Sequence, residues 1–231
     1  MVRVGIIGGS GFTGAELLRL LAAHPALEPV VVTADTQAGV PVRELYPSLA
    51  PTYGDLRFVA VDEVAFDDLD LAFFALPHGA SQTLVPDVRG TVAHVVDLAA
   101  DFRLKDAGLY PTWYGEEHHA PELLAEFVYG LPERHRDELV GARAVAVPGC
   151  YPTAATLPLA PLLDAGAVEP DGVVVDAASG ASARGDPRSP TRPSVRWTRT
   201  SRPTACSLIA TPPRSNRTSV GGCSSRPTWS P

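Results

Sequence analysis

A glycine-rich turn near the N-terminus constrains the fold of this chain more than any other feature. Residues 2–7 form an apolar run typical of a buried parallel strand, and the segment Gly-Gly-Ser-Gly-Phe-Thr-Gly at residues 8–14 follows without a break. Apolar residues then recur at helical spacing over residues 15–22, until His24-Pro25 ends the pattern. A strand, a glycine loop and a helix in this order predict a nucleotide-binding turn.

Each glycine of this turn has a predicted role. Gly8 allows the tight turn, Gly11 lets the backbone approach a pyrophosphate, and Gly14 lets the helix pack closely. The N-terminus of the helix then faces the anion. The spacing is G-x-x-G-x-x-G rather than G-x-G-x-x-G, so a tight turn without a ligand is the alternative interpretation.

The end of the second predicted strand, residues 29–33, is where such a fold meets the adenosine ribose. An acidic side chain there accepts a hydrogen bond from the 2′-hydroxyl and repels a 2′-phosphate. Thr33 and Thr36 could bind a phosphate, but Asp35 lies between them. These residues alone leave NAD and NADP both open.

The remaining pattern predicts an α/β fold, a Rossmann-like doubly wound parallel sheet. Further strands are expected at residues 56–61, 69–75, 92–97 and 145–147, alternating with helical segments. A helix over residues 153–163 and a strand over 172–177 should follow. Ligands bind beyond the carboxyl ends of such strands, so the loops at His78 and at 101–103 belong to the functional edge, unless these side chains only make structural hydrogen bonds.

Cys150 lies at a predicted strand-to-helix corner. The apolar run stops at Pro148-Gly149, and Pro152 is a residue favoured in the first turn of a helix. A helix N-terminus stabilises a thiolate through its unpaired N–H groups and its dipole. Cys150 is therefore a candidate nucleophile, and the alternative is a small buried hydrophobe.

Several function classes are disfavoured by composition. The Glu116-Glu117-His118-His119 segment suggests metal binding, but adjacent residues rarely converge on one ion, so we expect a solvated loop and no metal. Three widely spaced cysteines give no disulfide framework, and no signal-peptide pattern or membrane-length apolar run occurs. We expect a cytoplasmic protein that binds no membrane.

A nucleotide site combined with a corner cysteine suggests hydride transfer at the acyl oxidation level. The thiolate would attack an activated acyl group, and a nicotinamide would reduce the resulting thioester to an aldehyde. This chemistry needs an acid/base partner, normally histidine. All six histidines precede Cys150.

The motifs along the chain resemble those of the N-acetyl-γ-glutamyl-phosphate reductase family, within the semialdehyde dehydrogenase group. The resemblance runs in order from residue 1 to about 182. It rests on the glycine turn and on these four segments: Leu76-Pro77-His78-Gly79, Ala100-Asp101-Phe102-Arg103-Leu104, Tyr129-Gly130-Leu131-Pro132-Glu133 and Pro148-Gly149-Cys150-Tyr151-Pro152-Thr153-Ala154.

The resemblance implies NADPH-dependent reduction of N-acetylglutamyl 5-phosphate to the semialdehyde with release of phosphate, a step of arginine biosynthesis. Cys150 falls on the family nucleophile, and Arg103 is our candidate for binding the acyl-phosphate substrate. The positions that fall on cofactor contacts are Gly8, Ser10, Gly11, Phe12, Thr13, Gly14, Ser179 and Gly180. Asp35 departs from the small or polar residue expected with NADP(H).

The predicted domains are a dinucleotide-binding domain at 1–149 and the beginning of an α+β catalytic and dimerisation domain at 150–182. Family members are expected to form homo-oligomers and carry a His-Arg-His-Thr-Pro-Glu motif further on. This chain lacks that motif in its printed reading frame, so we expect this form to be inactive.

Residues 183–231 carry an abrupt change in composition. The whole chain has 26 acidic and 19 basic residues, which give a net charge of −7. Residues 187–231 hold eight of the basic residues, all arginines, and none of the acidic ones. We can shift the reading frame of the gene by one base and choose, for each residue, any codon that encodes it. The segment Ser207–Gly221 then reads PHRHTPEIEPDLGG, which contains the missing motif. We therefore expect 183–231 to be an out-of-frame, disordered tail rather than a nucleic-acid-binding arm.

Two alternatives remain. Another acyl-phosphate reductase, acting on an N-acetylaminoadipyl phosphate or of the aspartate-semialdehyde type, would share the turn and the cysteine. A non-catalytic nucleotide-binding module with a basic arm would bind DNA in a salt-dependent manner through residues 187–231.

Overall fold

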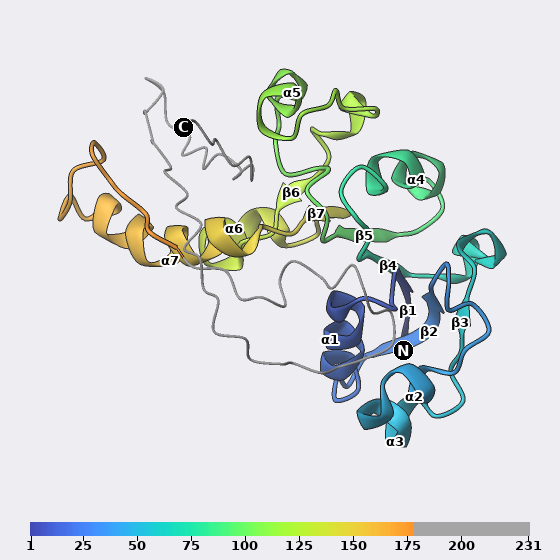
Figure 1. The fold of residues 1–231 in the computed structure, drawn as a ribbon. Coiled ribbons are helices and arrows are strands. Elements are labelled where there is room, and N and C mark those ends of the chain that lie inside the picture. The colour runs from blue at the N-terminus through green and yellow to red at the C-terminus, as the bar shows by residue number, and fades with distance from the viewer. Residues whose placement is uncertain (178–231) are drawn as a thin grey trace, which may run out of the picture. The chain divides into compact units, whose positions relative to one another are not determined.

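The computed structural model describes residues 1–177, and its main feature is one seven-stranded sheet (Figure 1). Every strand pair in this sheet is parallel. The strands are β1 (Val2–Ile7), β2 (Leu27–Thr33), β3 (Phe58–Val59), β4 (Leu71–Phe74), β5 (His94–Asp97), β6 (Val128–Tyr129) and β7 (Ala144–Ala146). The predicted doubly wound parallel sheet is confirmed.

The strand order is β3-β2-β1-β4-β5-β7-β6. The chain first builds outward from β1 to β3 and then returns to place β4 on the other side of β1. This reversal lies between β1 and β4, and ligands of open α/β sheets bind at such a reversal, beyond the carboxyl ends of the strands.

Helices connect the strands. The α-helices are α1 (Phe12–Leu21), α2 (Val42–Leu45), α3 (Ala50–Tyr53), α4 (Ser81–Val88), α5 (Tyr110–Trp113), α6 (Pro132–Leu139) and α7 (Cys150–Asp164). Short 3₁₀ helices are η1 (Pro47–Leu49), η2 (Val61–Glu63), η3 (Phe66–Asp68), η4 (Ala107–Leu109) and η5 (Pro121–Leu123).

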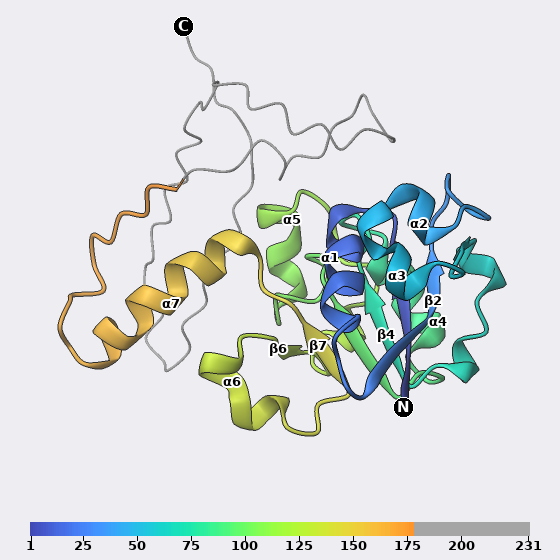
Figure 2. The same ribbon diagram turned by 90° about the horizontal axis from the view of Figure 1, so that it is seen from below.

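The sheet is buried on both faces, as helix-covered parallel sheets are. Ile6 and Ile7 point to opposite faces because successive strand side chains alternate, and both are fully buried. Ile6 packs in a core with residues of α1, α2 and α3, whereas Ile7 packs in a second core with residues of α4 and α5. Figures 1 and 2 show α1 and α4 on opposite sides of the sheet.

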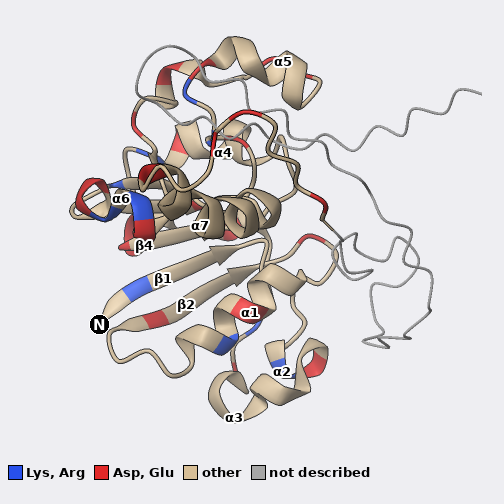
Figure 3. Cartoon of the chain, turned by 90° about the vertical axis from the view of Figure 1, so that its left-hand side faces the viewer, with Lys and Arg blue, Asp and Glu red and all other residues tan. Residues whose placement is uncertain are grey.

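Two charged residues of the sheet lie near the starts of their strands. Arg3 of β1 and Glu28 of β2 are partners in the parallel register, and Figure 3 shows them as neighbouring blue and red bands. The Arg3 Nε also donates to the Asp68 carbonyl oxygen at 2.7 Å. These contacts lie at the edge of the sheet opposite the predicted site.

Several details differ from the sequence prediction. The third strand spans only Phe58–Val59, and β6 was not predicted because a two-residue strand is too short to show periodicity. The strand expected at 172–177 is wrong, since these residues carry no strand and Val174 is 84% exposed. An apolar run becomes a strand only where a neighbouring strand accepts its hydrogen bonds, and residues 1–177 offer it none.

Helix α7 begins at Cys150, three residues earlier than the pattern predicted. Pro152 is compatible with this start because the first four N–H groups of a helix have no intrahelical acceptor. Pro158 and Pro161 lie inside the helix, where each removes one backbone donor.

The chain divides into two compact units, Met1–Gly149 and the part that begins at Cys150. The first holds the whole sheet, and the described part of the second holds α7 and residues 165–177. Within residues 1–177, no helix is both long and apolar enough to cross a bilayer.

Candidate dinucleotide site and nucleophile

The loops predicted to carry function converge on one edge of the sheet. The glycine turn follows β1, the His78 loop follows β4, the 98–103 loop follows β5 and the 147–149 segment follows β7. All these strands are parallel, so their carboxyl ends lie at the same edge. The first two loops flank the reversal between β1 and β4.

The glycine turn is held to the end of β2. Gly8 has φ of +88°, a conformation that favours glycine, and its N–H donates to Thr33 Oγ1 at 2.9 Å. The Gly9 N–H donates to the Thr33 carbonyl oxygen at 2.8 Å. Thr33, considered above as a phosphate ligand, is buried and holds the turn.

Close packing of α1 onto the turn requires glycine at position 14. A Cβ on Gly14 would lie 2.4 Å from the Gly9 Cα, whereas a Cβ on Gly11 would meet nothing closer than the Gly8 carbonyl oxygen at 3.9 Å. The helix therefore packs on the turn at Gly14, and the space beside Gly11 is open. Open space at this position is what a pyrophosphate group needs.

The start of α1 fits an anion. Gly11 is the N-cap and makes no side-chain cap, and the first turn contains no acidic residue. The helix dipole and the unpaired N–H groups of this turn are therefore not neutralised by the chain itself. Phe12 is 66% exposed, Thr13 is exposed and Ser10 is partly exposed, so ligands can reach the turn.

Asp35 is exposed just after β2. It lies at the position where a dinucleotide-binding fold meets the adenosine ribose. Its carboxylate is the one acidic group of the 33–36 segment.

Asp101 organises the loop after β4. It is fully buried, and its two carboxylate oxygens accept hydrogen bonds from the Gly79 N–H at 2.8 Å and the Gln82 N–H at 3.0 Å. His78 Nδ1 lies 2.6 Å from Asp101 Oδ1, and His78 Nε2 lies 3.2 Å from Glu116 Oε1. Carboxylates therefore hold both nitrogens of the His78 ring.

The 116–119 segment is only partly the solvated loop that was expected. Its neighbours are exposed, but His118 is 8% exposed and its Nε2 donates to the Asp101 carbonyl oxygen at 2.6 Å. Its Nδ1 accepts from the Ala120 N–H, which fixes the neutral tautomer. Burial lowers the pKa of His118. Within residues 1–177, no cluster of histidine, cysteine or carboxylate groups could hold a metal ion.

Asp97 ends β5 and is fully buried. Its Oδ1 accepts a hydrogen bond from the Ala99 N–H at 3.2 Å, and the buried Ser81 side chain interacts with the same carboxyl group. Burial, with a smaller contribution from the charge of Asp101, raises the pKa of Asp97 to about 6. Sequence analysis missed this residue, because nothing in an apolar strand marks its last side chain as buried.

Arg103 holds the backbone that leads to the nucleophile. Its Nε donates to the Val147 carbonyl oxygen at 2.8 Å, and its Nη2 donates to the Leu98 carbonyl oxygen at 2.9 Å. The Val147 N–H donates to the Asp97 carbonyl oxygen at 2.8 Å. Val147 is thus fixed on both sides, between the ends of β5 and β7.

Cys150 is exposed and is the first residue of α7, so the alternative of a buried hydrophobe is wrong. The first turn of α7 contains no acidic residue. Ser179 and Gly180, the other predicted cofactor contacts, lie outside the described residues.

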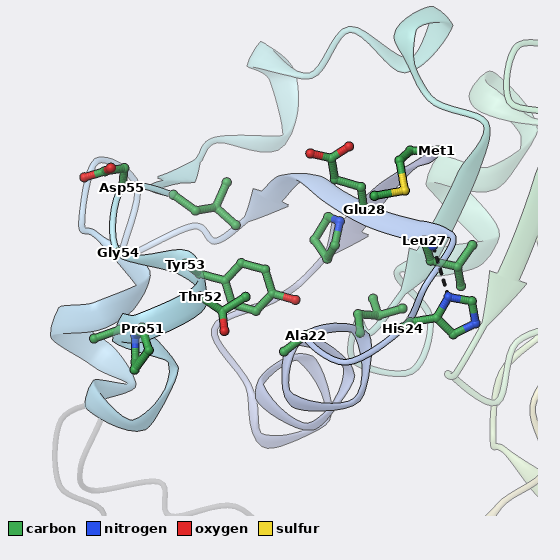
Figure 4. A pocket seen from close by; sticks show the side chains of 14 residues that line it. Met1, Ala22, His24, Leu27, Glu28, Pro51, Thr52, Tyr53, Gly54 and Asp55 are labelled. Atoms are coloured by element: carbon green, nitrogen blue, oxygen red, sulfur yellow. Dashed lines mark hydrogen bonds between the residues drawn. The ribbon is translucent and has the colours of Figure 1, made fainter.

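A separate cleft lies at the opposite edge of the sheet (Figure 4). It has a volume of about 550 Å³ and is lined by Met1, the start of β2 and residues 50–56. Its rim carries the carboxylates Glu28 and Asp55, which would repel an anionic dinucleotide. The glycine turn is therefore the better dinucleotide site.

Two family models match the chain. Residues 3–142 match "Semialdehyde dehydrogenase, NAD binding domain", and residues 150–202 match "Semialdehyde dehydrogenase, dimerisation domain". The first match contains the glycine turn and the His78 and Arg103 loops. The second begins at Cys150.

Curated relatives are reductases. The chain is 49% identical over 185 residues to the N-acetyl-gamma-glutamyl-phosphate reductase of Pseudomonas putida strain W619, and 48% identical over the same length to that of Azotobacter vinelandii. Each alignment covers 80% of this chain and 54% of the relative. The chain therefore spans about half the length of the curated relatives it matches.

Solved structures support the fold. Aspartate semialdehyde dehydrogenase II of Vibrio cholerae matches with a TM-score of 0.52 at 19% identity, over 71% of this chain and 46% of that one. Aspartate semialdehyde dehydrogenase of Francisella tularensis matches with a TM-score of 0.51 at 19% identity, over 72% of this chain and 42% of that one. At this identity the likeness shows the fold alone.

Substitution of the two glycines should separate folding from binding. Gly14→Ala places a Cβ against the Gly9 backbone and should lower the free energy of unfolding by about 1–3 kcal/mol. Gly11→Ala meets no nearby atom and should cost less than about 1 kcal/mol, yet weaken dinucleotide binding about tenfold by filling the open space. Urea unfolding and dinucleotide titration measure both effects, and unchanged binding by Gly11→Ala would contradict the assignment.

Asp97 should make stability depend on pH. Because its pKa is raised on folding, the native state binds the proton more tightly than the unfolded state, and stability falls as pH rises from about 4 to about 6. Asp97→Asn should flatten this decline and raise the free energy of unfolding at pH 7.5 by about 2 kcal/mol. The exposed Asp67→Asn is the matched control. An unaltered pH profile in Asp97→Asn would show that this carboxyl is not the cause.

Proposed function

The chain belongs to the semialdehyde dehydrogenase family, and from that premise we propose that it carries the cofactor site and the nucleophile of an N-acetyl-γ-glutamyl-phosphate reductase. The proposed reaction converts N-acetyl-L-glutamyl 5-phosphate to N-acetyl-L-glutamate 5-semialdehyde and phosphate, as part of arginine biosynthesis. The observation that carries the proposal is the glycine turn at the reversal between β1 and β4, followed along the chain by Cys150 at the start of α7.

The first unit is of the nicotinamide-dinucleotide-binding type. We propose that Gly8, Ser10, Gly11, Phe12, Thr13 and Gly14 bind the cofactor, together with Ser179 and Gly180. Support comes from the open space at Gly11 and from the uncapped N-terminus of α1. When bound, a reduced nicotinamide supplies the hydride for this chemistry.

We further propose that NADPH is the preferred cofactor, although Asp35 weakens that preference. A carboxylate beside the adenosine ribose repels a 2′-phosphate and favours the free 2′-hydroxyl of NADH. Replacement of Asp35 should therefore shift the balance in a predictable direction.

Cys150 is the proposed nucleophile. Its thiolate sulfur bonds to the acyl carbon, the bond from that carbon to the phosphate oxygen breaks, and phosphate leaves with the electron pair. The exposed position of Cys150 and the helix N-terminus both support this role, because the dipole stabilises the thiolate before attack.

Arg103 is the proposed substrate-binding cation. Its contacts with Val147 and Leu98 use two of the five N–H donors of the guanidinium, so the group both holds the backbone before Cys150 and carries positive charge at the functional edge. A guanidinium is well suited to bind a phosphate ester.

The alternatives are another acyl-phosphate reductase or a non-catalytic nucleotide-binding module. Identity of 49% to reductases of N-acetyl-γ-glutamyl phosphate supports the main proposal over the aspartate-semialdehyde type, whose structures match at 19%. The proposal includes a cytoplasmic location, homo-oligomers through the dimerisation domain and an out-of-frame origin of residues 183–231. No nucleic-acid or membrane partner is proposed.

Acyl transfer to Cys150 tests the proposed function. On incubation of the full chain with N-acetylglutamyl 5-phosphate, peptide mass spectrometry should find the acyl group on Cys150, with release of phosphate. Cys150→Ser should abolish both, and Cys206 and Cys223, still present in this variant, serve as internal controls for nonspecific acylation.

Rival acyl donors discriminate between the reductases. N-acetylaminoadipyl phosphate, one methylene longer, should acylate Cys150 about tenfold more slowly, and β-aspartyl phosphate more slowly still. Faster acylation by either donor would overturn the substrate assignment. Acylation spread equally over all three cysteines would overturn the assignment of Cys150 as the nucleophile.

Asp35→Ser should increase the preference for NADPH over NADH about tenfold, because it removes a negative charge facing the 2′-phosphate. Fluorescence titration of both cofactors measures the ratio of dissociation constants. Asp67→Ser is the control, because it alters an exposed carboxylate of η3, where the neighbouring Asp68 contacts Arg3 near the start of β1, at the opposite edge of the sheet. An unchanged ratio would place the ribose elsewhere.

A further inference from the structure

Tyr46 reaches from the segment after α2 to the glycine turn. Its hydroxyl donates to the Ser10 carbonyl oxygen at 2.5 Å and lies 3.2 Å from the Gly11 carbonyl oxygen. These contacts join positions 36 and 35 residues apart in the chain. No motif in the sequence marks Tyr46 as part of the turn.

The position of the Ser10 carbonyl group fixes the direction of one N–H group. In a planar trans peptide the C=O and the following N–H point in opposite directions. Because the Ser10 carbonyl oxygen faces the Tyr46 hydroxyl, the N–H group of Gly11 points away from it. The Gly11 carbonyl oxygen also accepts from the Ala15 N–H at 3.0 Å, so α1 itself holds the next peptide. The Gly11 N–H belongs to the N-cap of α1, where an anion binds a helix.

The tyrosine is itself firmly held. Its N–H donates to the Val42 carbonyl oxygen at 2.8 Å, and its own carbonyl oxygen accepts from the Leu49 N–H at 2.9 Å. Its ring packs against the core that contains Ile6 and Leu18. Burial raises the pKa of Tyr46, so the hydroxyl keeps its proton and remains a donor.

We propose that Tyr46 is a positioning residue for the dinucleotide pyrophosphate, holding the Gly11 N–H group in the direction in which it donates to the pyrophosphate. The proposal rests on the cofactor site proposed above. It deepens that proposal by naming a side chain that acts through the turn without touching the ligand.

Tyr53 provides a matched control. Its hydroxyl also donates to a backbone carbonyl of the α1 region, that of Leu18, at 3.0 Å. This contact lies in the last turns of α1, away from the N-terminus, and the Leu18 carbonyl oxygen is also held by the Ala22 N–H, as the Gly11 carbonyl oxygen is by the Ala15 N–H. Tyr53→Phe thus removes a similar bond without freeing the turn.

The test compares Tyr46→Phe and Tyr53→Phe in the full chain. Tyr46→Phe should weaken NADPH binding five- to tenfold, while Tyr53→Phe should leave it within twofold of the unsubstituted protein. Adenosine 2′-monophosphate has no pyrophosphate, so its dissociation constant should be the same in all three proteins. Fluorescence titration and competition give these values, and circular dichroism checks the fold.

Each other outcome has a definite meaning. Unchanged NADPH affinity in Tyr46→Phe, equal losses in both variants, or an equal loss for adenosine 2′-monophosphate would overturn the role of Tyr46. If the unsubstituted protein binds neither NADPH nor NADH, the cofactor site itself is wrong. Should Tyr46→Phe not fold, hydrogen exchange in the unsubstituted protein decides, since NADPH must then protect the Gly11 amide most.

Discussion

The contact of α1 with the turn below it is the constraint on which the rest of the site depends. The Gly14 position leaves no room for a side chain above Gly9, and a Cβ on Gly9 would in turn lie 2.1 Å from Val32 Cγ2 of β2. The turn is thus enclosed between a helix and a strand. Because the backbone fills this space, the start of α1 is held against the turn before any ligand arrives, which lowers the entropy lost on binding.

Buried carboxylates perform a comparable task on the other side of the strand reversal. Asp101 accepts hydrogen bonds from the loop after β4, and its carbonyl oxygen accepts from the buried Tyr110 and His118. Asp97 contributes its carbonyl oxygen to Val147 while its carboxyl group is buried at a cost in stability. Loops that would otherwise be independent are therefore connected through two residues of one segment, Asp97 through its backbone and Asp101 through both its backbone and its side chain.

Much of this arrangement could be predicted from the sequence, because its strongest signals are local. The strand Val2–Ile7, the glycine turn and the helix after it combine apolar periodicity with glycines at fixed spacing, and the structure confirms all three elements. The strand-to-helix corner before Cys150 is confirmed for the same reason.

The errors of the sequence-based prediction occur where contacts between residues distant in the sequence determine the local structure. The short strand β6 exists because Val128 pairs with Val145, and residues 172–177 form no strand because nothing described pairs with them. His118 is buried by contacts with Asp101, 17 residues away. Tyr46 and Asp97 likewise derive their importance from distant partners, which no periodicity in the sequence records.

Arg103 shows how structural and chemical roles can coincide in one side chain. A planar guanidinium presents five N–H donors in fixed directions, and two of them hold the carbonyl oxygens of Val147 and Leu98. A lysine could not do both, because its single ammonium group offers no comparable fork. The charge that would attract an acyl phosphate is thus carried by the same group that fixes the backbone three residues before Cys150. Under the proposed function, removing Arg103 would disturb substrate binding and the backbone before Cys150 together, so the two effects must be separated by measuring the affinity for inorganic phosphate apart from the alkylation rate of Cys150.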